Sequence, residues 1–501
     1  MIDDLRRITA LDIYPASVQR SPGGTYFLGR KAPTVNSEPH ASEKLVGSAA
    51  SHSGGCLPHA TKVGEIHGKC VCVGPCDHDN AAALRKLLPW TRPKCLGLAT
   101  SAGLGDRLGL ATPGHIRAIR GTNMAPVLAQ QSIREMTRTN RTPEQVMDCA
   151  TYGVIQEGFT DGFGSDADHL QTPEDITATV QAGFTQFTID PGVHVDNAAD
   201  NMNASNLAEK LAALDYETLA TSQADMQAAY ADKAFDLQGG GSVSMDRLAF
   251  ARAAVKYGRA VAYTVKMYRH LQQVATGPFE LEVSVDETDS PTTPAEHYFF
   301  AAELKRLGVE WVAMAPRFIG RFEKGVDYIG DIDSFAASFA EHVAVMQTVG
   351  PYKMSIHSGS DKFSIYPVIA ELTGGLVHLK TAGTSYLEAV RTIAGIDPGL
   401  FREIYDFSRK HYDRDKATYH VSADMSKVPP AAELSDEELA GHIDDFHTRQ
   451  ALHCTFGSVL TADGGTRFRN RLLAALKIDE ESHYAHLAAH IGRHLAPFGR
   501  C

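Results

Sequence analysis

The sequence lacks the long apolar stretches that a membrane protein would need. No window approaches the roughly 18 uninterrupted apolar residues of a membrane helix, and residues 1–7 (MIDDLRR) lack the apolar core of a signal peptide. Positive charge is also scarce, with 48 Lys and Arg against 60 Asp and Glu and a formal net charge of −12. Because nucleic-acid binding needs clustered positive charge, we expect a cytoplasmic protein without nucleic-acid or membrane partners. An association into homo-oligomers is left open.

Cysteine is sparse, and the common nucleotide-binding motifs are missing. Eight cysteines in 501 residues are too few for a disulfide framework. Cys70, Cys72 and Cys76, followed by His78, suggest a zinc knuckle, but the gap of one residue between the first two is shorter than zinc sites usually have. There is no P-loop, and residues 101–106 (SAGLGD) carry only a fragment of a dinucleotide fingerprint. Reduced cysteines and a site without a nucleotide are therefore favoured.

From about Lys94 onward, short apolar runs are each followed by a polar or glycine-rich turn and then a helical pattern. Eight alternations of strand and helix favour a closed α/β barrel of the TIM type, (β/α)8, over an open sheet. The expected strands are residues 96–100, 162–168, 184–190, 279–285, 309–315, 353–357, 376–380 and 453–460.

Three stretches fall outside this alternation. Residues 1–95, with a Ser/Gly/His-rich part at 42–68, are interpreted as an irregular N-terminal extension. Largely helical insertions are expected at about 197–269 and about 397–450. The barrel with its insertions then covers residues 96–501 as one domain.

The last predicted helix, from about residue 480, carries four histidines on one face. They are His483, His486, His490 and His494. Leucine and isoleucine lie next to them, so a packed amphipathic helix is favoured over a metal site.

The residues that act in a barrel lie at the carboxyl ends of its strands. Alternation along residues 279–286 predicts that Glu280, Glu282, Ser284 and Asp286 share the polar side of one strand. Several carboxylates inside a barrel would each cost several kcal/mol without a counter-charge. A metal ion or lysines must therefore balance them.

Three histidines, His169, His357 and His378, each lie at the end of a different predicted strand. A barrel brings such ligands together around one ion. Histidine with carboxylate suits a divalent ion of the Zn, Mn, Ni or Co class better than Ca or Mg. The alternative is three separately hydrogen-bonded histidines, but their shared position favours the metal.

Two further features indicate the binding of an anion. Lys380 lies two residues after His378, on the same side of the strand, and could neutralise an enolate or position a hydroxyl. The loop from Ser358 to Lys362 leads into a helical pattern, so its N–H groups predict a small site for a carboxylate or phosphate.

Five strings in this sequence resemble the tagaturonate/fructuronate epimerases, metal-dependent sugar-acid epimerases whose relatives also act on ketohexoses at C4. The strings are TSAGLGDRLGLATPGH at 100–115, ADH at 167–169, SVDETDSPTTP at 284–294, IHSGSDK at 356–362 and HLKTAGT at 378–384. The resemblance implies a barrel enzyme that interconverts D-tagaturonate and D-fructuronate. It also implies activity on the ketohexoses fructose and tagatose.

The resemblance also implies roles for individual residues. His169, His357 and His378 become the metal ligands, and Asp168 a proton acceptor beside the metal. For the second proton-transfer group, the alternation along the strand favours Glu282, which points inward, with Asp286 at the strand end as the alternative. The anion-site pattern of the loop and the positions at strand ends, rather than the resemblance, predict Asp286, Ser358, Lys362 and Lys380 as substrate-binding residues.

Other functions remain open from the sequence alone. A metal-dependent aldolase or isomerase of sugar acids would use the same ligands and base. A barrel-derived binding protein without chemistry is disfavoured, because such a scaffold has no reason to keep Asp168, Glu282 and Lys380 buried. Within an epimerase, retro-aldol cleavage and proton exchange between two side chains are both compatible with these residues.

Overall fold

The computed structural model describes residues 1–31, 44–50, 57–381 and 383–499. Its centre is a closed barrel of eight parallel strands that are neighbours in chain order, with the last strand pairing with the first. The strands are β7 (Ser101–Gly103), β8 (Ala125–Ser132), β9 (Gly164–Leu170), β10 (Gln186–Ile189), β13 (Glu280–Val285), β14 (Ala313–Pro316), β15 (Lys353–Ile356) and β16 (Val377–Lys380). The expected (β/α)8 barrel is confirmed.

Six of the eight expected strands overlap a barrel strand, and 96–100 ends beside β7. The expected strand at 453–460 is wrong, because these residues belong to helices α16 (Phe446–Cys454) and α17 (Phe456–Thr461). The barrel strand that is absent from the predicted set is β8, because its sequence APVLAQQS ends in polar residues rather than in an apolar run. Gln130 on this strand bonds to Asp168 inside the barrel, so its polar end faces the site.

The barrel helices begin where the sequence supplies caps. At α5 (Pro143–Gln156), α6 (Pro173–Gln181) and α10 (Pro294–Arg306), a threonine caps the helix, a proline holds the first position, and the third residue completes a capping box. The other helices around the barrel are α3 (Thr112–Ile119), α4 (Ile133–Thr139), α9 (Arg247–Val274), α11 (Ile332–Val349), α12 (Tyr366–Thr373) and α13 (Thr384–Ile396).

The N-terminal part differs from the expected irregular extension, because its described residues form a six-stranded antiparallel sheet. The strands are β1 (Leu11–Ile13), β2 (Gln19–Ser21), β3 (Gly24–Lys31), β4 (Lys44–Ala50), β5 (Thr61–Ile66) and β6 (Lys69–Pro75), flanked by α1 (Ile2–Thr9) and α2 (His78–Leu87). Strand β4 consists mostly of small residues, which conceal the strand pattern. A Cβ at Gly47 would lie 2.1 Å from the ring of Phe27, so the small residue makes room for that ring.

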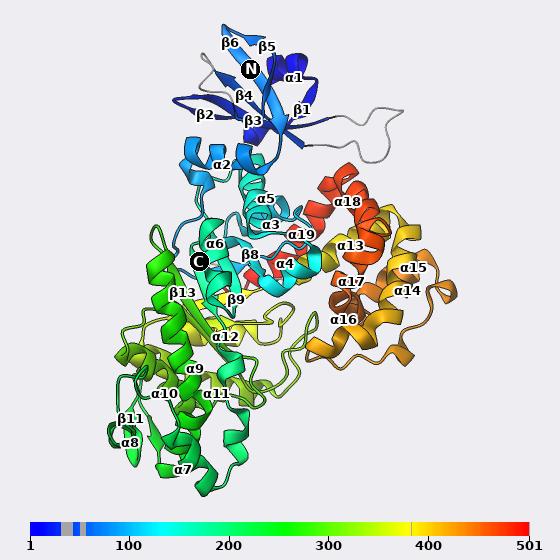
Figure 1. Cartoon of the computed structure of the whole chain (residues 1–501). Helices are drawn as coiled ribbons and strands as arrows, with labels where there is room; N and C mark the ends of the chain where they lie inside the picture. Colours follow the sequence, from blue (N-terminus) through cyan, green and yellow to red (C-terminus); the bar gives the residue numbers. More distant parts are fainter. Residues whose placement is uncertain (32–43, 51–56, 382, 500–501) are drawn as a thin grey trace.

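Both insertions are largely helical (Figure 1). The first contains α7 (Ala204–Ala212), α8 (Gln223–Tyr230) and a hairpin of β11 (Lys233–Asp236) and β12 (Ser242–Met245), and it lies at the end of the molecule opposite the N-terminal sheet. The second contains α14 (Pro398–Asp415) and α15 (Asp436–Gly441) and forms a lobe at the side of the barrel with α16, α17 and α18 (Arg469–Ile478).

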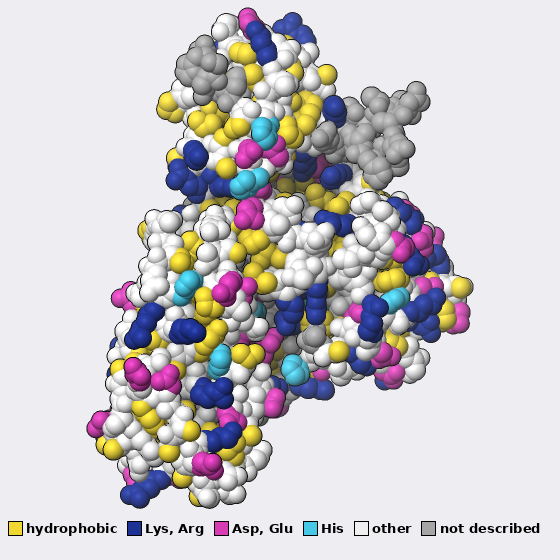
Figure 2. Space-filling view, viewed as in Figure 1, with side chains coloured by type: hydrophobic (Ala, Val, Ile, Leu, Met, Phe, Trp, Pro, Cys, Tyr) yellow, Lys and Arg dark blue, Asp and Glu magenta, His cyan; other side chains and the backbone are white. Residues whose placement is uncertain are grey.

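The last helix, α19 (Glu480–Leu495), packs against α3 and α13. In the view of Figure 2, lysine, arginine and acidic side chains are interspersed over the surface. Among the described residues, no helix combines the length and the apolar character needed to cross a bilayer.

Candidate active site

Asp168 and His169 are neighbours in β9, yet both side chains face the carboxyl end of the barrel. Alternate residues of a regular strand point to opposite faces. Here the pairing of β9 with β10 shifts by one residue between Ala167 and Leu170, and His169 has a φ of 51°, in the left-handed region. Such a bulge re-aims a side chain, and it turns both residues toward the same space.

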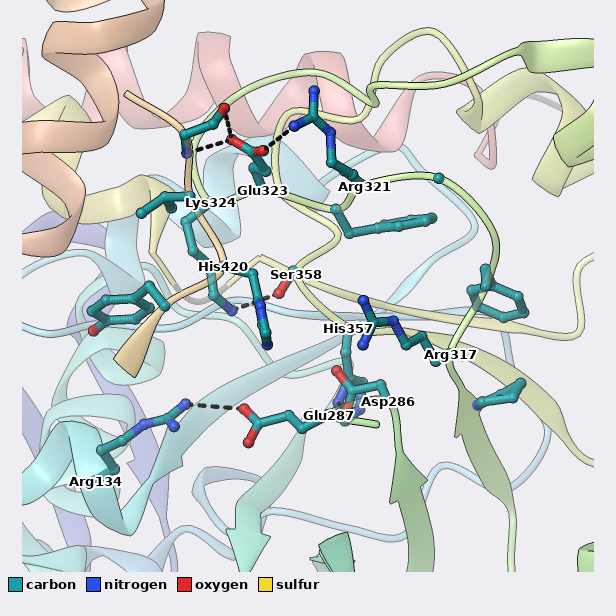
Figure 3. Close-up of a pocket in the computed structure, with 17 residues that line it drawn as sticks. Arg134, Asp286, Glu287, Arg317, Arg321, Glu323, Lys324, His357, Ser358 and His420 are labelled. Carbon is teal, nitrogen blue, oxygen red and sulfur yellow. Dashed lines mark hydrogen bonds and ion pairs between the residues drawn. The ribbon is translucent and has the colours of Figure 1, made fainter. Parts of the chain in front are cut away.

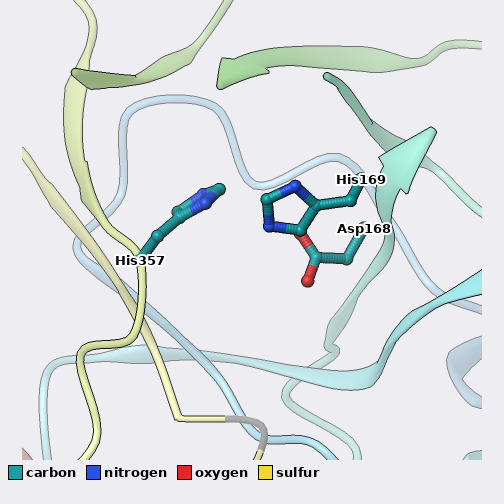
Figure 4. Close-up of side chains that lie close together, drawn as sticks. All are labelled: Asp168, His169 and His357. Carbon is teal, nitrogen blue, oxygen red and sulfur yellow. The ribbon is translucent and has the colours of Figure 1, made fainter. Parts of the chain in front are cut away.

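His357 follows directly after β15 and meets these two residues (Figure 4). Asp168, His169 and His357 each offer one ligand atom, and these atoms all lie within 4.8 Å of one another. The rings of the two histidines are 5.0 Å apart between centroids. We call these three residues the mouth group, and its donors are of the kind that borderline divalent ions prefer.

Lys380, at the end of β16, lies beneath the mouth group among three carboxylates. Its Nζ is 2.7 Å from Asp168 Oδ1, 2.7 Å from Glu282 Oε1 and 2.8 Å from Asp166 Oδ2. Burial opposes the ammonium charge, but these carboxylates raise the pKa of Lys380 well above its usual value. Burial raises the pKa of Asp166 to about 6. Burial would raise the pKa of Asp168 as well, but Lys380 and the neighbouring histidines hold it well below its usual range. Lys380 therefore stays protonated and Asp168 ionised at neutral pH.

Glu282 and Asp286 both contact His357, as the predicted alternation of β13 requires. His357 Nε2 is 2.6 Å from Glu282 Oε1, and its Nδ1 is 3.2 Å from Asp286 Oδ1. On the other side, His169 Nδ1 is 3.3 Å from Asp190 Oδ2. Burial disfavours a charged imidazole, but the surrounding carboxylates raise the pKa of His169 to about 10. The mouth group thus lies in a field that attracts positive charge, which fits a divalent cation.

His378 does not join the mouth group. Its Nδ1 is 2.9 Å from Ser101 Oγ, deeper in the barrel, and its buried Nε2 has no hydrogen-bond partner. Burial lowers the pKa of His378 to about 3, so its ring is neutral. Of the three expected histidine ligands, the structure brings together His169 and His357.

The expected anion site in the loop of Ser358 and Lys362 does not form as predicted. The Lys362 ammonium is buried and donates to the carbonyl oxygens of Glu323, Val326 and Ser360 at 2.5–2.9 Å. The loop N–H groups are also used, since that of Asp361 donates to a histidine and that of Lys362 to a tyrosine hydroxyl. Lys362 therefore lines neither cavity described below, whereas Ser358 lines both.

Two cavities with lining residues in common lie at the barrel mouth, and Figure 3 shows the outer one. The inner one, about 50 Å³, is lined by the mouth group, Lys380 and further polar residues, and the outer one is about 330 Å³. The shared lining residues are Arg134, Asp286, Glu287, Lys324, His357 and Ser358. Residues 419–422 of the second insertion also line the outer cavity, and Glu323 Oε2 accepts hydrogen bonds there from the backbone and hydroxyl of Ser422.

Several lining residues are not among those predicted from the sequence. They are Arg107, Arg134, Arg317, Lys324, Tyr419 and His420. Most come from loops and from the second insertion, where no periodic pattern assigns a direction to a side chain. Only Arg317, which follows the last residue of β14, occupies a position that a search of strand ends could have found.

A second cluster of the same residue types lies where the loop after β15 meets α19. Asp361, His490 and His494 also place one ligand atom each within 4.8 Å of the others, and we call them the helix group. His494 Nδ1 faces the His490 carbonyl oxygen at 2.9 Å, and its Nε2 accepts the N–H of Asp361 at 2.9 Å. Arg449 lies 3.2 Å from Asp361 Oδ1. Among the described residues these are the two such groups, and neither contains a cysteine, so the zinc knuckle is not supported.

Comparison with known proteins gives consistent matches over almost the whole chain. The family described as tagaturonate epimerase, UxaE, matches residues 14–498. The tagaturonate/fructuronate epimerase of Thermotoga maritima is 44% identical over 419 residues, which cover 84% of this chain and 85% of that protein. The native crystal structure of the fructuronate-tagaturonate epimerase UxaE from Cohnella laeviribosi has a TM-score of 0.90 at 37% identity and covers 99% of this chain and 98% of that one. A glycerol complex of the Cohnella protein has a TM-score of 0.89, with the same identity and coverage.

Proposed function

The chain belongs to the tagaturonate epimerase family and interconverts D-tagaturonate and D-fructuronate, and we propose that it does so with a divalent metal ion held at the barrel mouth. The observation that carries the metal is the mouth group, three donors of suitable type in a field of carboxylates beside a cavity. Activity on the neutral ketohexoses fructose and tagatose is a further prediction, because these share the ketone and the hydroxyl at the inverted carbon.

Asp168, His169 and His357 are the residues that would hold the ion. A divalent ion at such a site supplies a Lewis acid that stabilises negative charge on oxygen. Nitrogen and carboxylate donors favour Zn, Mn, Ni or Co. His378 remains a predicted ligand, and the lone buried Nε2 is the feature that supports it.

The protein's own groups are suited to moving a proton on and off a hydroxyl. The inverted carbon is β to the ketone, so simple enolisation does not acidify its C–H bond. In the retro-aldol route a base takes the proton of the hydroxyl on that carbon, the bond to the α-carbon breaks, and its electrons pass into an enediolate. The resulting aldehyde turns its other face before the bond forms again.

We assign the proton acceptor to Asp168 or Glu282. Lys380 and the histidines hold the pKa of both carboxyl groups below the usual range, so both are ionised at neutral pH. Lys380, protonated and bound to both, positions them and stabilises developing negative charge rather than acting as a base. Asp286 and Ser358 line the cavity and remain the proposed contacts to substrate, whereas Lys362 joins its own loop to the loop of Glu323 and Val326.

An experiment in deuterated water separates the two routes. The enzyme with bound metal converts tagaturonate in D₂O, and the product is examined by NMR at the inverted carbon. The retro-aldol route keeps the original hydrogen there, whereas proton exchange by two bases introduces deuterium. Accumulation of three-carbon products in the same reaction would identify an aldolase, and no conversion at all would reject the proposed function.

A further inference from the structure

Lys324 differs from the other cationic side chains around the inner cavity. The cavity is lined by Arg107, Arg134, Lys324 and Lys380. All except Lys324 have a carboxylate partner within 3.5 Å: Arg107 pairs with Glu135, Arg134 with Glu287, and Lys380 with Asp166, Asp168 and Glu282. No carboxylate oxygen of the described residues lies within 4.0 Å of Lys324 Nζ. Its partner is a neutral hydroxyl, that of Ser358, at 2.6 Å.

The position of Lys324 is fixed by both of its chain neighbours. Glu323 is buried and accepts bonds from Ser422 and from Gln450 Nε2, which ties the loop to the second insertion. The carbonyl of Gly325 accepts a bond from Arg449. The Lys324 side chain is half-buried and points at the Ser358 hydroxyl, in the wall that the two cavities share (Figure 3).

This arrangement leaves donors for a ligand. An ammonium group has three N–H donors, and Ser358 uses one of them. A cation that is partly removed from water without a counter-charge is costly, and an anion beside it removes that cost. Ser358 follows His357 of the mouth group directly, so a ligand bound at Lys324 is also within reach of the candidate metal site.

We propose that Lys324 binds the carboxylate of the sugar-acid substrate and thereby makes the enzyme prefer sugar acids to neutral ketohexoses. The inference rests on the proposed function, since it assigns the part of that site that recognises the acid. A ketohexose offers a neutral hydroxymethyl group at the same end and leaves the ammonium without its counter-charge. Charge-assisted hydrogen bonds are about twice as strong as neutral ones, and sites built for a polar group reject analogues that lack it.

The test compares Lys324→Met with Arg321→Gln in the metal-loaded enzyme. Arg321 lines the same outer cavity but is exposed and lies 3.4 Å from Glu323, so it is the matched cationic control. Two quantities are measured: kcat/KM for tagaturonate, and the affinities of D-galactonate and galactitol, an acid and its uncharged counterpart, by calorimetry. We expect Lys324→Met to lower kcat/KM by about 100-fold and to abolish the tighter binding of galactonate, while Arg321→Gln changes neither.

Other variants keep the proposal falsifiable. Lys324→Arg retains the charge and should recover part of the preference for galactonate, and an unchanged thermal midpoint of each variant excludes misfolding. Retention of the preference for galactonate in folded Lys324→Met, or its loss instead in Arg317→Gln, would overturn the proposal.

Arg317 is the alternative carboxylate-binding residue, because it also has no carboxylate partner among the described residues, but it lines only the outer cavity. If the wild-type enzyme does not convert tagaturonate, the proposed function fails, and the calorimetric comparison still tests Lys324.

Discussion

The mouth group and the helix group contain the same residue types, but their surroundings differ. Each combines one aspartate with two histidines whose ligand atoms lie within 4.8 Å of one another. Around the mouth group, Glu282, Asp286 and Asp190 add negative charge, and a cavity opens beside it. Both groups also have a cation beside them, but its share differs: at the mouth, Lys380 is divided among Asp166, Asp168 and Glu282. At the helix group, Arg449 lies against Asp361 with one further buried carboxylate, Glu388, nearby.

The free electron pairs of the histidines also differ between the groups. Both ring nitrogens of His494 are used, one by a backbone carbonyl and the other by the N–H of Asp361. In the mouth group both ring nitrogens of His357 are also occupied, but by the carboxylates of Glu282 and Asp286, and His169 Nε2 lies 3.7 Å from Asp168 Oδ1, beyond hydrogen-bond distance. The comparison teaches that ligand identity and distance do not define a metal site, whereas the balance of surrounding charge and the kind of partner at each ring nitrogen do.

The largest expected effect within this comparison is the loss of activity in Glu282→Gln. The amide keeps the size of the side chain but cannot accept a proton or balance Lys380 and His357, so kcat should fall by about 10²–10⁴-fold. Steady-state kinetics on tagaturonate measure it. If the variant retains kcat, then Asp168 or Asp286 is the proton-transfer group instead.

A smaller effect is expected from Asp361→Asn in the helix group, and it should fall on stability. Removing this buried charge breaks the shortest ion pair of Arg449 and leaves it the more distant Glu388 and Asp444, which should lower the free energy of unfolding by about 3 kcal/mol. Denaturant titration measures the loss. Asp327→Asn is the control, since Asp327 is an exposed aspartate of a neighbouring loop that bonds to Ser364, and its loss should cost about 1 kcal/mol or less.

The contribution of Asp361 to the free energy of unfolding should also depend on pH. Burial opposes the charge of Asp361, but Arg449 and the two histidines hold its pKa well below the usual range. A carboxyl whose pKa is depressed on folding contributes stability above its unfolded pKa of about 4, and this contribution is lost as the pH falls. The difference in stability between wild type and Asp361→Asn should therefore narrow between about pH 5 and pH 3. A difference that stays constant over this range would show that the charge of Asp361 is not what stabilises the helix group.

The sequence predicts the barrel and much of the mouth because both follow from periodicity. Parallel strands bring their carboxyl ends to one rim, so His169, His357, Glu282 and Lys380 could be predicted to converge. His378 shows the limit of this argument. Alternation gives the side of a strand but not the depth, and two residues of strand correspond to about 7 Å along the barrel.

The remaining differences come from contacts between distant segments. Lys362 was predicted to bind an anion, but the carbonyl groups of Glu323 and Val326, on another loop, meet its ammonium. Lys324 reaches the cavity from that same loop, which is itself held by the second insertion. Such contacts leave no pattern in the local sequence, because they depend on how loops more than 30 residues apart pack against each other.

The most direct test of the central claim is elemental analysis of three purified proteins: wild type, His357→Ala and His490→Ala. If the mouth group holds the metal and the helix group serves stability, wild type carries about one divalent ion per chain, His357→Ala carries none and is inactive, and His490→Ala keeps its ion. Metal and epimerase activity retained in His357→Ala, or lost from a folded His490→Ala, would contradict the assignment of the two groups.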